Sequence, residues 1–265
     1  MNIQFTLYAI DSGLFGGLPS EHTYLSVPGH NFNCFGRFDG GRLVRASTGS
    51  AAWACAVYGH DNEGGQDSGA PTGMTIRYNG VCQNLANRIL ALVTDDIDAR
   101  STLGNVLATL MYGKYGFGMD QYVSAVKNAG AKLLSEGSGE IQQSDIDTAV
   151  NRIAAGQTAD AELDILHADI AEQENITLPP ITDAQRSLCR PIYAEYQADR
   201  AAVFAQVAIT APPSEQIAYD KLPRGLVAPL EKCVEGLVDA LGLDQFKLIF
   251  GVDPAALKAK FAGFL

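Results

Sequence analysis

One cysteine of this sequence stands where a helix is expected to begin. Cys82 follows the Asn79-Gly80 pair, which ends a short strand-like run. Apolar residues then recur at the helical spacings of four, four and three, at Val81, Leu85, Ile89 and Leu92. The unpaired N–H groups and the positive dipole end of a first helical turn favour a thiolate over a thiol. The position of Cys82 therefore predicts a nucleophilic cysteine with a pKa well below that of a free thiol.

A cysteine nucleophile needs a base within hydrogen-bond reach and a group that orients the base. Among the four histidines, His22 is our first choice because it opens a strand after a loop and lies in the same half of the chain as Cys82. His30 and His60 lie in glycine-rich loops, and His167 falls in a helix of the other half. The sequence therefore predicts a Cys82–His22 pair.

The residue that orients His22 is expected on the strand that follows, facing the same way. Asn33 is the first candidate, because an asparagine oxygen can accept from the imidazole N–H. Asn31 is the second candidate, and Asp39, which falls in a turn, is the third. A plain role in a loop or hairpin stays open for each of them.

The order of these residues resembles the permuted NlpC-type papain-like fold, a group that includes the lecithin:retinol acyltransferases. In that fold a histidine opens a strand, a hairpin follows, and the cysteine comes later at a helix N-terminus. The stretch Gly80-Val-Cys-Gln-Asn-Leu-Ala-Asn-Arg-Ile-Leu90 is also similar to the phrase GVCHQxANRIL of bacterial proteins. Gln83-Asn84 stand where that phrase has His-Gln. The resemblance covers residues 2–95 at most and says nothing of the rest.

The resemblance implies a cysteine-dependent hydrolase of amide bonds that works through an acyl-enzyme, with Cys82 as nucleophile and His22 as base. The Cys82 backbone N–H and Gln83 would hold the oxyanion. Its class would be a peptidase, a cell-wall amidase or a deamidase, such as a bacterial toxin or effector. The expected partners are a peptide or protein amide substrate and an inhibitor or immunity protein, with no cofactor and no metal.

Two other functions stay open at this stage. One is an acyltransferase or thioesterase of the same fold, which would need an apolar groove beside Cys82. The other is a catalytically degenerate interaction module, since alanine-rich amphipathic segments in the second half suit helix–helix packing. An active enzyme needs an accessible and acidic Cys82 thiol, whereas a degenerate domain would bury an inert one.

Composition narrows the range of partners. The 265 residues carry a formal net charge of −11, which argues against nucleic acid and anionic membranes as partners. No apolar run is long enough to span a bilayer, and the N-terminus lacks the pattern of a secretory signal. We therefore expect a protein made in the cytoplasm; a signal-independent export route would leave no trace in the sequence.

The five cysteines are odd in number and include no CxxC pair, so free thiols are expected and zinc is not. The four cysteines other than Cys82 are interpreted as small buried hydrophobes, namely Cys34, Cys55, Cys189 and Cys233.

A shift in composition near residue 98 predicts two domains, 1–98 and 99–265. More than half of the 27 glycines and no lysine precede that point. In the first half, apolar and polar residues alternate as they do in strands. The predicted strands cover residues 2–10, 22–27, 32–38, 42–46 and 74–78, and a short helix is predicted over 50–58. The second half predicts helices over 99–113, 119–135, 143–156, 158–175, 183–208, 225–241, 243–249 and 254–264. The expected fold is α+β: a small antiparallel sheet carrying the nucleophile helix, followed by a mostly helical region.

Overall fold

A computed structural model describes residues 2–11, 21–27, 30–32, 42–50, 73–75, 78–93, 106–136, 143–210 and 222–262. These residues form an α+β protein in which helices predominate, as expected. Contacts divide the chain into two units: unit 1 comprises residues 1–102 and 114–157, and unit 2 comprises residues 103–113 and 158–265. By contacts, residues 114–157, which follow the boundary predicted near residue 98, group with the first unit.

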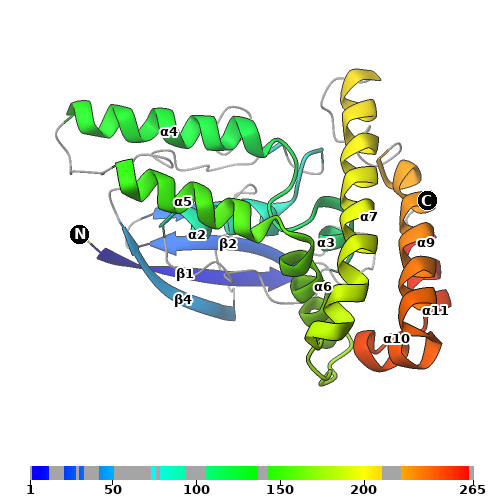
Figure 1. Cartoon of the computed structure of the whole chain (residues 1–265). Coiled ribbons are helices and arrows are strands. Elements are labelled where there is room, and N and C mark those ends of the chain that lie inside the picture. The colour runs from blue at the N-terminus through cyan, green and yellow to red at the C-terminus, as the bar shows by residue number, and fades with distance from the viewer. Residues whose placement is uncertain are drawn as a thin grey trace. The chain divides into compact units, whose positions relative to one another are not determined.

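Unit 1 contains a four-stranded antiparallel sheet (Figure 1). Its strands are β1 (Asn2–Asp11), β2 (Glu21–Val27), β3 (His30–Phe32) and β4 (Arg42–Ser50), in the spatial order β3-β2-β1-β4. Of the strand expected over 32–38, only Phe32 is described, and it is the last residue of β3. Residues 33–38 lie outside the described part, as do residues 51–58 of the short helix expected over 50–58. Of the strand expected over 74–78, the described residues Met74, Thr75 and Tyr78 are not in a strand. The N–H groups of Tyr78 and Asn79 both donate to the Thr75 carbonyl, which marks a turn.

One face of the sheet is apolar and buried. Along β1 the residues Phe5, Leu7 and Ala9 are buried, while Thr6 and Tyr8 between them are partly exposed. The register pairs Leu7 with Leu25 and Ala9 with Thr23, so β2 contributes its odd-numbered residues to the same face. This alternation is what a sheet with one face in the core requires.

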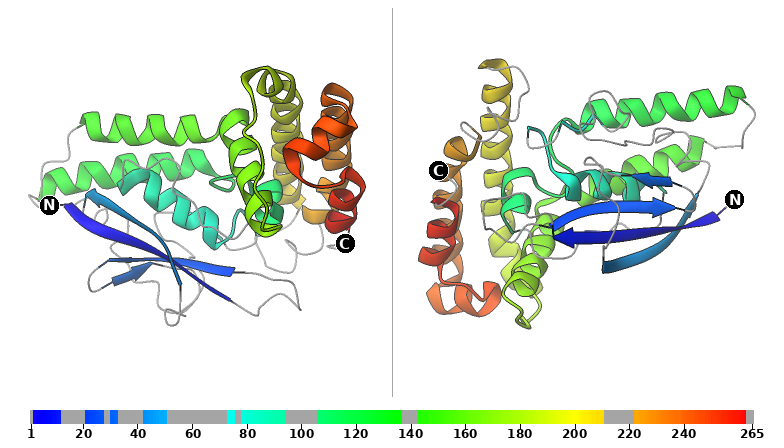
Figure 2. Two further views of the ribbon diagram at one scale, coloured as in Figure 1. Left: turned by 90° about the horizontal axis from the view of Figure 1, so that it is seen from below. Right: turned by 180° about the vertical axis from the view of Figure 1, so that it is seen from behind.

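Helices of unit 1 are stacked over the sheet. Helix α2 (Cys82–Val93) lies between β2 and α5 (Gln143–Gly156), and α4 (Met119–Glu136) lies beside α5 (Figure 2). The expected helices over 119–135 and 143–156 are thereby confirmed almost to the residue. Because α2 packs on the sheet directly, it brings its first residue, Cys82, against β2.

Unit 2 is entirely helical in its described part. Its helices are α3 (Val106–Tyr112), α6 (Ala159–Gln173), α7 (Asp183–Thr210), α9 (Leu222–Leu241), α10 (Leu243–Phe250) and α11 (Pro254–Ala262). Helices α7 and α9 run side by side in opposite directions (Figure 1). They approach closely where a Cβ on Gly225 would lie 2.5 Å from Val203, and one on Gly236 would lie 3.0 Å from Ile192. The expected positions of these helices hold; the helix expected over 99–113 is described only from residue 106, and α3 ends at Tyr112.

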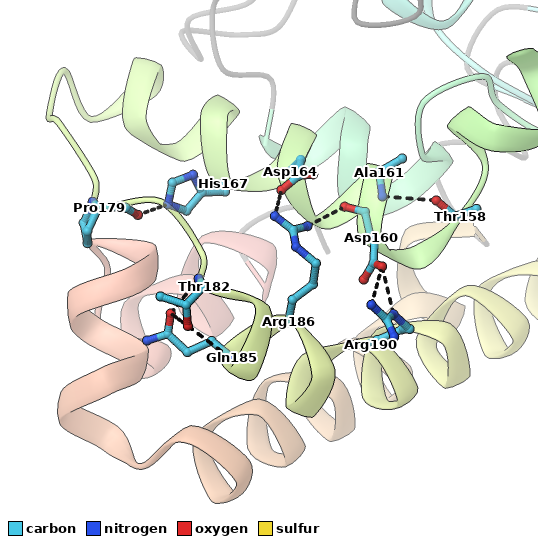
Figure 3. A network of polar contacts seen from close by, with 10 residues as sticks. All are labelled: Thr158, Asp160, Ala161, Asp164, His167, Pro179, Thr182, Gln185, Arg186 and Arg190. Carbon is cyan, nitrogen blue, oxygen red and sulfur yellow. Dashed lines mark hydrogen bonds and ion pairs between the residues drawn. The ribbon is translucent and has the colours of Figure 1, made fainter.

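Polar contacts fix the start of α7 and its position against α6 (Figure 3). The N–H of Thr182 donates to Gln185 Oε1 over 2.9 Å, and the N–H of Gln185 donates to Thr182 Oγ1 over 3.3 Å, which is a capping box. Two ion pairs of 2.7 Å each then join the helices, Arg186 to Asp164 and Arg190 to Asp160. Helix α7 continues through Pro191 without a break.

Candidate functional site

A turn and a side-chain cap together start α2 at Cys82. The N–H of Asn79 donates to the Thr75 carbonyl over 3.1 Å, and Asn79 Oδ1 accepts from the Thr75 N–H over 2.7 Å, which closes the turn before the helix. Gly80 comes next, where a Cβ would lie only 2.4 Å from the Met74 sulfur. The N–H of Val81 donates to Asn84 Oδ1 over 2.9 Å, so one orphan donor of the helix start is satisfied.

The Cys82 thiol is buried in unit 1, with 7% of the residue exposed. It donates a hydrogen bond to Gln83 Oε1 over 3.2 Å. Burial raises the pKa of Cys82, and this outweighs the polar groups of Thr23, Gln83 and the Cys82 backbone, which lower it. The expected low pKa is therefore corrected: the desolvated sulfur is a thiol at neutral pH despite its place at a helix N-terminus.

His22 lies on the other face of β2 from Cys82. Thr23 borders the sulfur of Cys82 and pairs with Ala9 on the apolar face of the sheet. Successive residues of a strand point to opposite faces, so His22 and Tyr24 share the face away from α2. There the rings of His22 and Tyr24 stack with centroids 6.3 Å apart, and Tyr24 stacks on Tyr8 at 5.2 Å. The structure brings the two elements of the expected pair together, but turns imidazole and thiol to opposite sides.

The other expected site residues take different places. Asn33 and Asp39 lie outside the described residues. Asn31 lies in β3, where its backbone pairs with Ser26. Gln83 presents its amide oxygen to the thiol, whereas an oxyanion donor would have to present its N–H groups.

The polar face of α2 binds backbone carbonyls of the segment before α4, a role that the sequence did not predict. Asn84 Nδ2 and Asn87 Nδ2 both donate to the Lys114 carbonyl, over 3.1 and 2.9 Å. Arg88, fully buried, donates from Nε to the Tyr115 carbonyl and from Nη2 to the Phe117 carbonyl, each over 2.5 Å. The spacing of residues 84, 87 and 88, on one helix face, was the available signal. These side chains anchor the segment that precedes α4.

Arg88 also meets Tyr122 of α4. Its guanidinium lies 5.2 Å from the centroid of the Tyr122 ring, and the Tyr122 hydroxyl donates to the Arg88 carbonyl over 2.9 Å. Arg88 therefore ties α2 both to α4 and to the segment that precedes α4.

The other described cysteines form no second candidate centre. Cys189 and Cys233 are buried in unit 2, where burial raises their pKa values to about 11 and about 12. Cys34 and Cys55 lie outside the described residues. Within the described ranges, no group of three or more His, Cys, Asp or Glu side chains could hold a metal ion. None of the helices described is both long and apolar enough to cross a membrane.

Comparisons of this chain with protein-family models, curated proteins and solved structures give no match.

Proposed function

We propose that this chain acts by noncovalent binding, with an α+β unit that resembles a cysteine hydrolase but is catalytically degenerate. The observation that carries the proposal is the state of Cys82: a buried thiol, hydrogen-bonded to Gln83, whose pKa burial raises. A nucleophilic cysteine needs the opposite, an accessible sulfur with a lowered pKa and a base beside it. Here His22 faces away from α2, so Cys82 serves the packing of α2 on β2.

The second candidate is a papain-like cysteine hydrolase of peptide or protein amides. Two observations favour it: Cys82 is the first residue of α2, and polar groups of Thr23 next to the sulfur favour the thiolate. In this candidate the site must open to admit substrate, and His22 must reach the α2 side of β2 to accept the thiol proton.

The rate of iodoacetamide alkylation at Cys82 separates the two candidates. It is followed on the Cys82 peptide by mass spectrometry, in the wild type and in His22→Ala, with the urea-unfolded protein as the reference for full reactivity. We expect slow reaction at pH 7, a rise only at alkaline pH, and no effect of His22→Ala. A rate already at its plateau below pH 7 and lost in His22→Ala would establish the hydrolase instead.

Helix α7 offers the surface for binding. Its exposed face carries small residues at heptad spacing over most of its length, at Ser187, Pro191, Ala194, Ala198, Ala201, Ala205 and Ala208. Two large apolar residues, Leu188 and Ile209, are 49% and 81% exposed on the same helix. Small residues repeated every three and four positions let a second helix approach closely. A second copy of the chain is the occupant proposed, because two such faces packed antiparallel about a two-fold axis would place small residues opposite small residues, for example Ala194 opposite Ala201.

Sedimentation equilibrium of the full chain tests this surface. The wild type should dimerise, and Ala198→Arg should weaken the dimer at least tenfold without changing the far-UV circular dichroism. Ala228→Arg, the same substitution at an exposed position of α9, is the control and should leave the dimer intact. A wild type that stays monomeric at every concentration measured would remove α7 as a self-association surface.

A further inference from the structure

A buried ion pair lies at the centre of unit 2. Arg200 Nη2 and Glu162 Oε1 are 2.9 Å apart, and their side chains are only 6% and 5% exposed. Arg200 Nη1 also donates to the carbonyls of Thr109 and Leu110 in α3, each over 3.2 Å. The Tyr196 hydroxyl donates to the same Leu110 carbonyl over 2.8 Å. The pair thus ties α6 and α7 to the C-terminal turn of α3.

Three buried polar atoms of this cluster have no hydrogen-bond partner among the residues that the structure describes: Glu162 Oε2, Arg200 Nε and Tyr193 Oη. Glu162 Oε2 and Arg200 Nε belong to the two groups that already form the ion pair. Tyr193 lies beside the pair: its ring centroid is 5.7 Å from that of Tyr196, and the Arg200 guanidinium lies 5.6 Å from the same Tyr196 ring. Burial raises the pKa of the Tyr193 hydroxyl, and the Glu162 carboxylate raises it further. Leaving even one such atom unsatisfied costs about 1–3 kcal/mol, so three in one place indicate a shared ligand.

We propose that Glu162, Tyr193 and Arg200 together hold one internal water molecule. The chemistry of the three atoms selects it. A carboxylate oxygen accepts, an Nε–H donates, and a phenol hydroxyl does either, so the ligand must both donate and accept. The ion pair is neutral overall, which disfavours a cation beside Arg200 and an anion beside Glu162. Buried waters typically make about three hydrogen bonds to polar groups that would otherwise be unsatisfied.

The Nε–H proton of Arg200 reports the water directly. In a ¹⁵N-labelled full chain, we expect a cross-peak between this proton and the water resonance, with the sign of a long-lived dipolar contact rather than of proton exchange. Arg88 is the matched control, since it is also buried but its Nε donates directly to the Tyr115 carbonyl, so it should show no such cross-peak. If the Arg200 Nε–H proton, like that of Arg88, shows no cross-peak with water, Arg200 instead binds Glu162 directly through two parallel hydrogen bonds. That result would overturn the proposal.

The variant Tyr193→Phe gives a second readout, because it removes one hydroxyl and little else. If the Tyr193 hydroxyl binds the water, the variant loses this hydrogen bond, and its Tm should be about 2–4 °C below that of the wild type. Removal of an unsatisfied hydroxyl would instead leave Tm unchanged or raise it, against the proposal. Tyr196→Phe, which removes the hydrogen bond to Leu110, sets the scale of the effect. A lower Tm without a water cross-peak at Arg200 would assign the Tyr193 hydroxyl to a direct bond with Glu162, again without water.

Discussion

The thiol of Cys82 donates to the side-chain oxygen of the next residue, Gln83, over 3.2 Å in the buried interior of unit 1. This contact gives Cys82 the properties of a core residue. Cys82→Ala should therefore lower the free energy of unfolding by about 1 kcal/mol, through lost packing and a lost hydrogen bond. Urea denaturation measures it, with Cys189→Ala, at another buried thiol, as the matched control. A strained nucleophile would show the reverse, a gain in stability on its removal.

Arg88 should be the side chain of α2 on which unit 1 depends most. Arg88→Lys keeps the charge but removes the two separate hydrogen bonds that Nε and Nη2 of Arg88 donate to the Tyr115 and Phe117 carbonyls. We expect a loss of about 2 kcal/mol or more, because hydrogen bonds from charged donors are strong and the site is buried. The amide of Phe117, which donates to the Asn79 carbonyl over 2.7 Å, should exchange with solvent much faster. Arg224→Lys, at an exposed position of α9, should change stability by less than about 0.5 kcal/mol.

Most of the helices could be predicted because the pattern that forms them is local. In α9 the buried residues Leu226, Leu230, Cys233 and Leu237 recur at helical spacing, and this repeat is visible without a structure. The same holds for the capping box of Thr182 and Gln185, whose partners are three residues apart. Local spacing also placed the start of α2 at Cys82.

The arrangement around Cys82 could not be predicted, because it depends on a single step of register. Whether His22 or Thr23 faces α2 is decided by which face of β2 packs on α2, and a shift of one residue would exchange them. The sequence of β2 does not decide this, because each face carries one polar and one largely apolar residue: His22 and Tyr24 on one face, Thr23 and Leu25 on the other. The anchoring role of Arg88 was hidden for another reason: its carbonyl partners lie 27 and 29 residues along the chain.

Gly113 of unit 2 is a position where the addition of one methyl group should lower stability strongly. Its φ is +69°, and a Cβ there would lie 2.1 Å from Glu162 Oε1 and 2.7 Å from Arg200 Nη2. Gly113→Ala should therefore cost the backbone strain of about 1 kcal/mol and, in addition, part of the buried ion pair. Gly242→Ala is the matched control, because Gly242 has a φ of +80° with nothing within 4 Å of its would-be Cβ. Equal losses of stability in the two variants, measured by urea denaturation, would show that the ion pair tolerates the extra methyl group.

His167 should make unit 2 less stable in mild acid. Its Nε2 lies 3.0 Å from the Pro179 carbonyl (Figure 3), and its pKa is lowered from 6.5 chiefly because the ring is partly buried. The Arg186 charge lowers the pKa further, while the Pro179 and Ile249 carbonyls and the Asp164 carboxylate raise it without reversing the shift. The unfolded chain therefore binds this proton more readily than the folded one. The contribution of neutral His167 to the free energy of unfolding is complete above the unfolded pKa of about 6.5. It is lost as the pH falls through that value toward the folded pKa.

His167→Gln isolates this effect, because glutamine can still donate to the Pro179 carbonyl but does not titrate. Urea midpoints are measured for both proteins between about pH 8 and pH 5, a range that includes the ordinary histidine pKa. The wild type should lose stability relative to the variant as the pH falls, with a constant difference at the alkaline end. The carboxylates that titrate near pH 5 are common to both proteins, so they cancel in the difference. A wild type that gains stability relative to the variant in acid would mean that Asp164 and the two carbonyls outweigh burial, and that folded His167 prefers to be charged.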